Sequence, residues 1–269
     1  MAAQEQLRKY VADLKVSDLL AELWTGIAFY TRVPMRQTAA VSGADLGRAI
    51  WCSPIVGLLI GLCGALVYWI AVRLKVPPMP AAALTVGAVL LLTGALHEDG
   101  LADTADGFGG GDTRERKLEI MRDSRIGTYG VCALAMSFLI RVGALTELSQ
   151  VARASVIMWA LVAAHAASRA LLAPLMLIVV PARSDGLAAT AGQPPGARVA
   201  VACVLGLIVL LLGLGFKAGL LTLLLMLAAA IVFAWISLRQ IGGQTGDVLG
   251  AQQQVAECLV LVCAAAAVG

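Results

Sequence analysis

The sequence predicts an all-α, polytopic membrane protein with about seven transmembrane helices and an N-terminal interfacial or half-inserted helix. Of the 269 residues, 60% are hydrophobic and 14% are charged, whereas a soluble domain has roughly 45–50% apolar and about 25% charged residues. Apolar runs of the length that a membrane helix needs, about 20 residues, follow one another along the chain. They leave no room for a soluble domain, so we expect one membrane-embedded domain over residues 1–269.

Seven segments have the composition of a membrane-spanning helix, although the second and the fifth are short. They are Ala49–Val72, Ala81–Leu96, Gly127–Leu148, Ala154–Val180, Val199–Gly215, Gly219–Leu238 and Ala251–Val268. The fourth is long enough to tilt, and Pro174 is expected to kink it. Ahead of them, Leu19–Pro34 is apolar with charges near both ends and is too short to cross. It predicts a helix at the membrane interface.

The distribution of Lys and Arg predicts a cytoplasmic N-terminus. If the helices alternate from there, fourteen of these residues, Arg8, Lys9 and Arg36 among them, lie on the cytoplasmic side and four lie outside, as the positive-inside rule requires. Residues 1–48 then form a cytoplasmic or interfacial segment, and residues 97–126 form a catalytic cytoplasmic loop. Met1–Leu20 lacks the apolar core of a secretory signal. The net charge of +3 gives no reason to expect nucleic acid as a partner.

Three aspartates in a glycine-rich segment are the strongest candidates for chemistry. If His97–Gly107 continues the second spanning helix, Asp99, Asp103 and Asp106 lie on one face, at positions i, i+4 and i+7. Carboxylates this close repel one another, and clustered oxygen ligands suit Mg²⁺ or Mn²⁺ better than zinc. The glycines between them would let a phosphate ligand or another helix approach. A solvated acidic turn is the alternative, but three carboxylates in register at a membrane edge favour a functional site.

A second group of candidates follows the acidic segment. Asp123 is a candidate metal ligand or acid–base group. Arg122 and Arg125 are either phosphate clamps, for which guanidinium groups are well suited, or positively charged anchors on the cytoplasmic side. Ser124 or Thr128 is expected to cap the third spanning helix, because both residue types are good N-caps.

A third group precedes and enters the last spanning helix. The glycines of Gly242–Asp247 lead into a helix N-terminus, which makes a candidate anion site, and Asp247 is a candidate metal ligand from across the bundle. Gln253 and Glu257 lie one turn apart and are expected to face the interior, either toward a substrate or in helix–helix hydrogen bonds. Arg169 lies within an apolar span and needs a partner or a water-filled site.

Together these segments resemble a known family, cobalamin synthase, also called adenosylcobinamide-GDP ribazoletransferase. The runs that are similar to family segments are Phe29–Pro34, Gly94–Gly107, Glu119–Gly130, Arg183–Gly186 and Gly243–Ala251. The resemblance covers nearly the whole chain. It implies a late step of coenzyme B12 assembly, in which adenosylcobinamide-GDP is joined to α-ribazole, or to its 5′-phosphate, and GMP is released. It also implies Mg²⁺ as cofactor and a multi-pass protein of the bacterial inner membrane.

For such a phosphoryl-type transfer, which depends mainly on positioning and charge neutralisation, we expect a metal site and a general base. The expected metal ligands are Asp99, Asp103, Asp106 and Asp247, and the expected base is Asp106 or Asp123. The remaining candidates contact a substrate or its phosphates, and they are His97, Glu98, Gly100, Gly107, Arg122, Ser124, Arg125, Arg169, Arg183, Thr245, Gln253 and Glu257. The expected partners are the two substrates, membrane lipid, and either a second copy of the chain or other late cobalamin enzymes.

Two other functions stay open as alternatives. A CDP-alcohol phosphotransferase also uses spaced aspartates at a helix end, but the run Asp99–Asp103 lacks the arginine of that motif and the later spacing differs. A cation-coupled transporter would place ionisable groups near the middle of the bilayer on several helices. Here the sequence predicts that they gather at one membrane face, which favours an enzyme.

Overall fold

The computed structural model describes residues 15–34 and 42–268, and within these ranges it consists of helices and their connections. Six stretches are long and apolar enough to cross a membrane. They are α3 to α4 (Gly43–Ala49 and Ser53–Arg73, joined by the 3₁₀ turn Ile50–Cys52), α8 (Thr128–Val151), α9 to α10 (Ala154–Ala170 and Leu172–Ile178), α12 (Gly196–Leu214), α13 (Phe216–Ile241) and α14 (Gly246–Ala266). A polytopic helix bundle is therefore confirmed. The predicted cations Arg8, Lys9 and Arg36, and much of the segment 1–48, lie outside the described residues.

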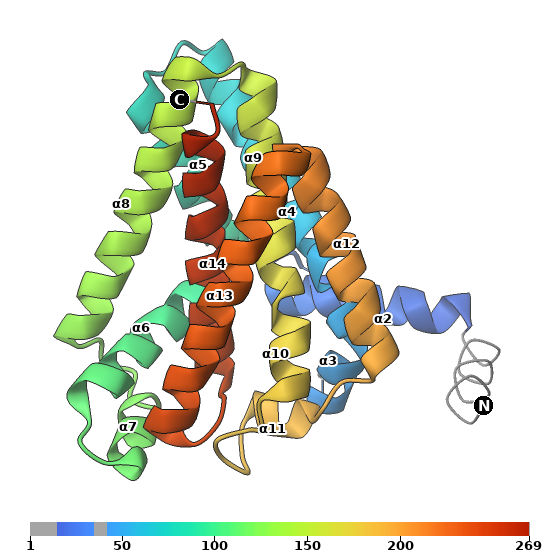
Figure 1. Cartoon of the computed structure of the whole chain (residues 1–269), viewed down its shortest axis with the longest axis vertical. Coiled ribbons are helices and arrows are strands. Elements are labelled where there is room, and N and C mark those ends of the chain that lie inside the picture. Colours follow the sequence, from blue (N-terminus) through green and yellow to red (C-terminus); the bar gives the residue numbers. More distant parts are fainter. Residues whose placement is uncertain (1–14, 35–41, 269) are drawn as a thin grey trace.

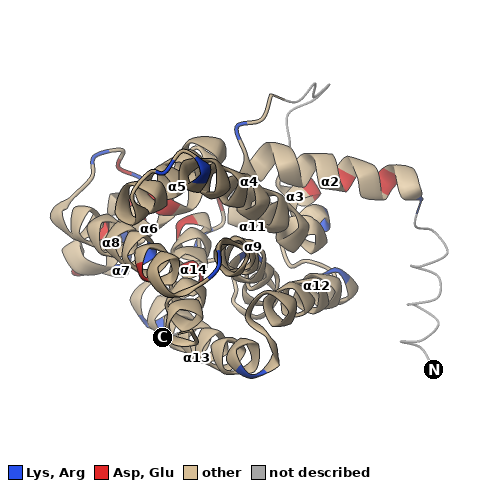
Figure 2. Ribbon diagram, turned by 90° about the horizontal axis from the view of Figure 1, so that it is seen from above, with Lys and Arg blue, Asp and Glu red and all other residues tan. Residues whose placement is uncertain are grey.

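The spanning helices run side by side, and their connections gather at the two ends of the bundle (Figure 1). The turns between α8 and α9 and between α12 and α13 lie at one end, whereas α7 (Arg114–Ile120), α11 (Leu187–Ala191) and the turn before α14 lie at the other. The most buried of the six spans is formed by α9 and α10. Seen along the bundle, most of the helical ribbon belongs to residues other than Lys, Arg, Asp and Glu (Figure 2). This is the composition expected of helices that face lipid.

The acidic segment does not continue the second spanning helix, so that prediction is wrong. α5 (Pro78–Thr93) ends at Gly94 and Ala95, which both have left-handed backbone angles, φ 65° and φ 60°. α6 (Leu96–Gly110) then leaves at 91° to α5 and descends toward α7 at the loop end of the bundle (Figure 1). Sixteen residues of α5 reach only about 24 Å at 1.5 Å per residue, less than the roughly 30 Å hydrocarbon core. α6 therefore starts within the depth of the bundle, and the expected loop 97–126 is largely helical.

Two further helix boundaries matter for the site. α14 begins at Gly246 rather than near Ala251, so Asp247 lies in its first turn. The fourth span divides into α9 and α10 at Leu171. This is next to Ala170, whose carbonyl cannot accept a hydrogen bond from Pro174. Proline removes an N–H and crowds the carbonyl four residues earlier, which explains the predicted break.

α2 (Val16–Tyr30) extends sideways from the bundle instead of running along it (Figure 1). Its Glu22 side chain accepts a hydrogen bond from Trp51 Nε1 at 2.7 Å and forms an ion pair with Arg198 at 2.7 Å. Trp24 on α2 is about half exposed. An apolar helix anchored sideways at the rim, with an exposed tryptophan, has the geometry expected of an interfacial helix.

Candidate active site

Two helices that are far apart in the sequence, α6 and α14, cross closely at the acidic residues. A Cβ atom on Gly100 would lie 2.8 Å from the carbonyl oxygen of Asp247, and one on Gly250 would lie 3.3 Å from the α carbon of His97. The distance at Gly100 leaves no room for a side chain and the distance at Gly250 is tighter than an ordinary contact, so the glycines allow the backbones to approach. The expectation that the glycines admit another helix is confirmed. The result is that Asp99 and Asp247, from different helices, both border one cavity.

Asp99, Asp103 and Asp247, which we call the acidic centre, influence one another electrostatically. Burial, followed by the nearby charges of Asp99, Asp247 and Asp106, raises the pKa of Asp103 to about 7. The guanidinium of Arg183 lies 3.8 Å from the Asp247 carboxylate, while Asp99 is exposed. A cluster of acids that raises the pKa of one of its own members is a site that favours a cation.

Three cavities meet at the acidic centre. The apolar pocket, of about 170 Å³, is lined by hydrocarbon side chains such as those of Phe29, Leu46 and Leu172. Asp99 and Asp247 also line it. The lateral cavity, of about 550 Å³, lies beside α6 and is lined by Glu98, Asp99 and Asp103. The loop cavity, of about 260 Å³, is lined by Arg183 and Asp247. Groups bound in different cavities can therefore reach the same carboxylates.

Asp106 has a different environment from the other aspartates of α6. Its Oδ2 accepts a hydrogen bond from the backbone N–H of Gly127 at 2.6 Å, and its Oδ1 accepts one from Gly130 at 2.8 Å. The carboxylate thus caps the N-terminus of α8, where a negative charge is stabilised. The prediction that Ser124 or Thr128 caps this helix is wrong, because its N-cap residue is Gly127 and no side chain of its own segment caps it.

The residues expected to clamp phosphate before α8 are paired with acids. Arg125 donates to Asp123 at 2.6 Å, and Arg122 donates to both oxygens of Asp185, each at 2.6 Å. The hydrogen bonds from Arg125 lower the pKa of Asp123 to about 2, so this carboxylate is a weak proton acceptor. Ser124 lies close by, on the wall of the lateral cavity.

Other predicted site residues belong to a buried ionic network that joins four helices. Arg141 Nη1 donates to Glu98 at 2.9 Å and to Glu257 at 3.2 Å, and His165 Nδ1 lies 3.0 Å from Glu257. The side chains of all four are 5% exposed or less. The prediction that ionisable groups gather at one membrane face is therefore wrong for this network, which lies inside α6, α8, α9 and α14.

The network extends to His97, Arg169 and Gln253. Arg169 Nη2 lies 3.4 Å from His97 Nδ1, and Gln253 Nε2 donates to Glu257 at 2.7 Å and to Ser168 at 2.9 Å. For Gln253 and Glu257 the geometry therefore supports the helix–helix alternative. Arg141 is a member of this network that sequence reasoning missed. The available signal for Arg141 was the pair of intramembrane acids, Glu98 and Glu257, which require a buried cation.

The remaining candidates position the loop end of the bundle. Thr245 caps α14 by accepting the N–H of Val248 at 3.3 Å. A Cβ atom on Gly107 would lie 3.0 Å from the carbonyl oxygen of Lys117, so this glycine lets α7 pack against α6. Arg183 Nη1 is buried without a hydrogen-bond partner in the described structure and lies at the loop cavity.

Within residues 15–34 and 42–268, no three His, Cys, Asp or Glu side chains are arranged to hold one metal ion together. The four expected ligands therefore do not form a complete cage of protein groups. The geometry supports Asp99, Asp103 and Asp247 as neighbours and directs Asp106 toward α8.

Comparison with known proteins covers almost the whole chain. Residues 22–265 match the family described as cobalamin-5-phosphate synthase. The chain is 50% identical over 262 residues to the adenosylcobinamide-GDP ribazoletransferase of Bradyrhizobium diazoefficiens, covering 97% of this chain and 96% of the relative. It is 49% identical to the enzyme of that name from Mesorhizobium japonicum, with 94% and 96% covered, and 44% identical to that of Ralstonia nicotianae, with 89% and 92% covered. No solved structure matches the chain.

Proposed function

The chain belongs to the cobalamin-5-phosphate synthase family, and on this basis we propose that it acts as an adenosylcobinamide-GDP ribazoletransferase, as its relatives are named. The reaction is the nucleotide-loop assembly step of cobalamin biosynthesis. A ribose hydroxyl that is free both in α-ribazole and in its 5′-phosphate attacks the phosphorus nearer cobinamide, and GMP leaves with the bridging oxygen. The observation that supports this chemistry best is the meeting of three cavities at the acidic centre.

Magnesium fits the donors of the acidic centre. Mg²⁺ keeps several waters and usually binds one or two carboxylates together with substrate phosphates, so a complete protein cage is not required. Asp99 and Asp247, on facing helices, would hold the ion, and Asp103 would lie beside it without binding it. Bound there, it would neutralise the diphosphate and stabilise the leaving oxygen.

Arg183 and the start of α14 would bind the diphosphate in the loop cavity. The unpartnered Nη1 of Arg183 is a charged donor, and charge-assisted bonds to phosphate are among the stronger hydrogen bonds. The first N–H groups of α14 begin at Gly246 on the same cavity wall, and a helix N-terminus favours an anion. The arginine would therefore fix the phosphates beside Asp247.

Asp103 is better suited to act as general base than Asp106 or Asp123. Its pKa of about 7 is close to the operating pH, where a general base is most effective. It would accept the proton of the attacking hydroxyl while the new phosphorus–oxygen bond forms and the bond to the bridging oxygen breaks. Asp106 has both oxygens engaged by α8, and Asp123 has its pKa lowered to about 2.

We further propose that the acidic centre faces the cytoplasm across the bacterial inner membrane. The proposal follows from the positive-inside distribution of Lys and Arg, and the nucleotide substrate is cytoplasmic. The buried network that a cation-coupled transporter would need is present, but its acids are paired with Arg141 and His165. Such pairing supports a structural role, and the family favours the enzyme over both alternatives.

The test is GMP release by the purified full chain in nanodiscs, with adenosylcobinamide-GDP, α-ribazole and saturating Mg²⁺. We expect release to require all three, and Asp99→Asn and Asp247→Asn to lower turnover about a hundredfold or more. Asp112→Asn, which alters an exposed aspartate between α6 and α7, is the matched control and should be near normal. Near-normal turnover in Asp99→Asn, Asp103→Asn and Asp247→Asn alike would refute the metal assignment.

A further inference from the structure

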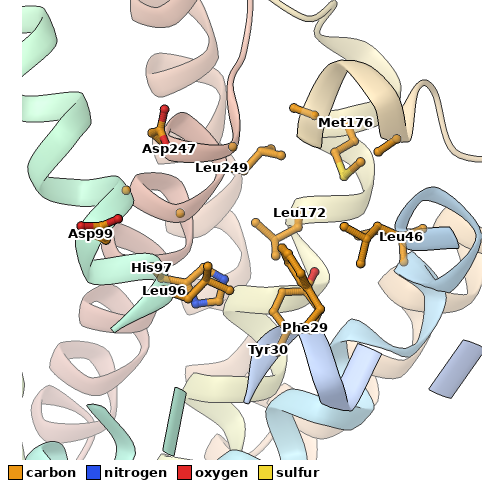
Figure 3. A pocket seen from close by; sticks show the side chains of 16 residues that line it. Phe29, Tyr30, Leu46, Leu96, His97, Asp99, Leu172, Met176, Asp247 and Leu249 are labelled. Atoms are coloured by element: carbon orange, nitrogen blue, oxygen red, sulfur yellow. The ribbon is translucent and has the colours of Figure 1, made fainter. Parts of the chain in front are cut away.

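The apolar pocket joins the acidic centre to a wall of hydrocarbon side chains. Phe29 of α2, Leu46 of α3 and Leu172 of α10 line it together with Met176. Asp99 and Asp247 lie at its opposite end, as Figure 3 shows. A molecule that fills this pocket needs an apolar body and a reactive group that reaches the carboxylates.

We propose that the apolar pocket binds the benzimidazole base of α-ribazole and presents the attacking hydroxyl of its ribose to the acidic centre. The inference rests on the proposed function, because it assigns one substrate of that reaction to one of the three cavities. α-Ribazole has the required chemistry. Its base is a flat aromatic ring system with two methyl groups, and its polar ribose, with the attacking hydroxyl, extends from one side.

The size of the pocket excludes the larger substrate. An apolar cavity of about 150 Å³ holds benzene in another protein, so about 170 Å³, open at the acidic end, is suited to a small aromatic ring system. The corrin ring of adenosylcobinamide-GDP is far larger and carries amide groups around its edge. The lateral cavity, at about 550 Å³ and partly lined by acids, is the more suitable place for that side of the reaction.

Guanine is the other ring of suitable size, and the lining of the pocket disfavours it. Its edge carries an acceptor oxygen as well as N–H donors, and these groups need partners when they are buried. The polar side chains that line the pocket are Asp99 and Asp247, which are assigned to the metal, together with Tyr30 and His97. Arg169 lies 3.4 Å from His97 Nδ1, and the lining residues that the structure describes offer no Asn, Gln, Lys or Arg side chain as a donor to the guanine oxygen. The phosphates of GMP also have a better site in the loop cavity, beside Arg183.

Leu46 and Met176 lie at the end of the pocket away from the carboxylates (Figure 3). A base whose ribose reaches Asp99 would therefore direct its two methyl groups toward these side chains. Leu46 is only partly buried, so the bundle should tolerate its truncation. In a fitted apolar pocket, one methyl or methylene group changes kcat/KM about tenfold. Leu46 and Met176 are thus expected to set the preference for the methylated base.

The experiment compares α-ribazole with the same nucleoside lacking both ring methyl groups, using GMP release by the full chain in nanodiscs. The wild-type chain should prefer the methylated base. Leu46→Ala should lower that preference, measured as the ratio of the two kcat/KM values, about tenfold, and should leave the KM for adenosylcobinamide-GDP unchanged. Leu46→Met provides a milder change of shape, and its shift in the ratio should be smaller. Leu23→Ala, at a partly buried α2 residue outside the pocket, should leave the ratio unchanged.

A higher KM for adenosylcobinamide-GDP in Leu46→Ala, with an unchanged base preference, would overturn the inference in favour of guanine. Unchanged values for both substrates in Leu46→Ala and Met176→Ala would also overturn it, and would point to lipid in the pocket. Failure of the wild-type chain to release GMP in the presence of α-ribazole would instead overturn the proposed function itself.

Discussion

Gly100 and Asp247 approach so closely that a Cβ atom on Gly100 would lie 2.8 Å from the carbonyl oxygen and 3.0 Å from the α carbon of Asp247. The atoms in the way belong to the backbone, which cannot rotate aside as a side chain can. Gly100→Ala should therefore push α6 away from α14 and separate Asp99 from Asp247. A misplacement of about 1 Å at a reacting centre can cost about a hundredfold in rate. We expect a loss of this order in GMP release, together with weaker Mg²⁺ activation.

Gly110→Ala is the matched control on the same helix, because the nearest atom to its Cβ would be Ile120 Cδ1 at an ordinary 3.6 Å. It should keep nearly normal turnover. Equal activity of Gly100→Ala and Gly110→Ala would show that the close crossing of the two helices does not matter for the reaction.

Asp106→Ala should destabilise the protein by about 1–2 kcal/mol, because α8 loses the carboxylate that caps its N-terminus. Asp106→Asn keeps one acceptor oxygen and should fall between the wild type and Asp106→Ala. The measurement is the thermal unfolding midpoint of each variant in detergent, with turnover recorded well below that midpoint. If Asp106 acts only as a cap, turnover at low temperature survives. An Asp106→Asn variant of wild-type stability but without turnover would restore Asp106 as ligand or base.

The spanning helices could be predicted from the sequence because their signal, a run of apolar residues, is local. The bend between α5 and α6 could not, since Gly94 and Ala95 adopt left-handed angles and nothing around Ala95 in the sequence requires one. The helical period predicted that Asp99 and Asp103 share a helix face, and both do line the lateral cavity. It could not indicate that Asp106 caps α8, because this depends on where Gly127 lies in space.

Polar residues within the spans show the same limit. The sequence identified Arg169 as a group that needs a partner or a water-filled site, expected Glu98 at a substrate, and left Glu257 open between a substrate contact and helix–helix hydrogen bonds. The partners, Arg141 and His165, come from helices whose packing determines the pairing. Composition therefore shows that a buried charge must be compensated, and only the fold shows which residue compensates it.

Arg141→Leu should be among the most destabilising substitutions in the chain. It removes the cation between Glu98 and Glu257, and breaking a buried ion pair by removing one partner typically costs about 3–5 kcal/mol. Glu98→Gln combined with Arg141→Gln should be less destabilising than the sum of the single changes, since neither buried charge is then left alone. Chemical unfolding in detergent of the wild type, Glu98→Gln, Arg141→Gln and the double variant gives this double-mutant cycle. An additive result would show that the two residues do not interact in the folded protein.

Asp103→Asn should abolish turnover and yet stabilise the fold at alkaline pH. Folding raises the pKa of Asp103 from 3.8 to about 7, so the folded chain binds the extra proton between these values and loses stability as pH rises through that window. The asparagine carries no charge at any pH. Its unfolding midpoint should therefore exceed that of the wild type by more at about pH 8 than at about pH 4, in buffer without Mg²⁺.

Added Mg²⁺ should raise the wild-type midpoint more than that of the variant, because a ligand stabilises the state that binds it. The exposed control, Asp112→Asn, should show neither difference. A midpoint difference for Asp103→Asn that is the same at both pH values would mean that Asp103 has an ordinary pKa and is no better suited than its neighbours to accept the proton.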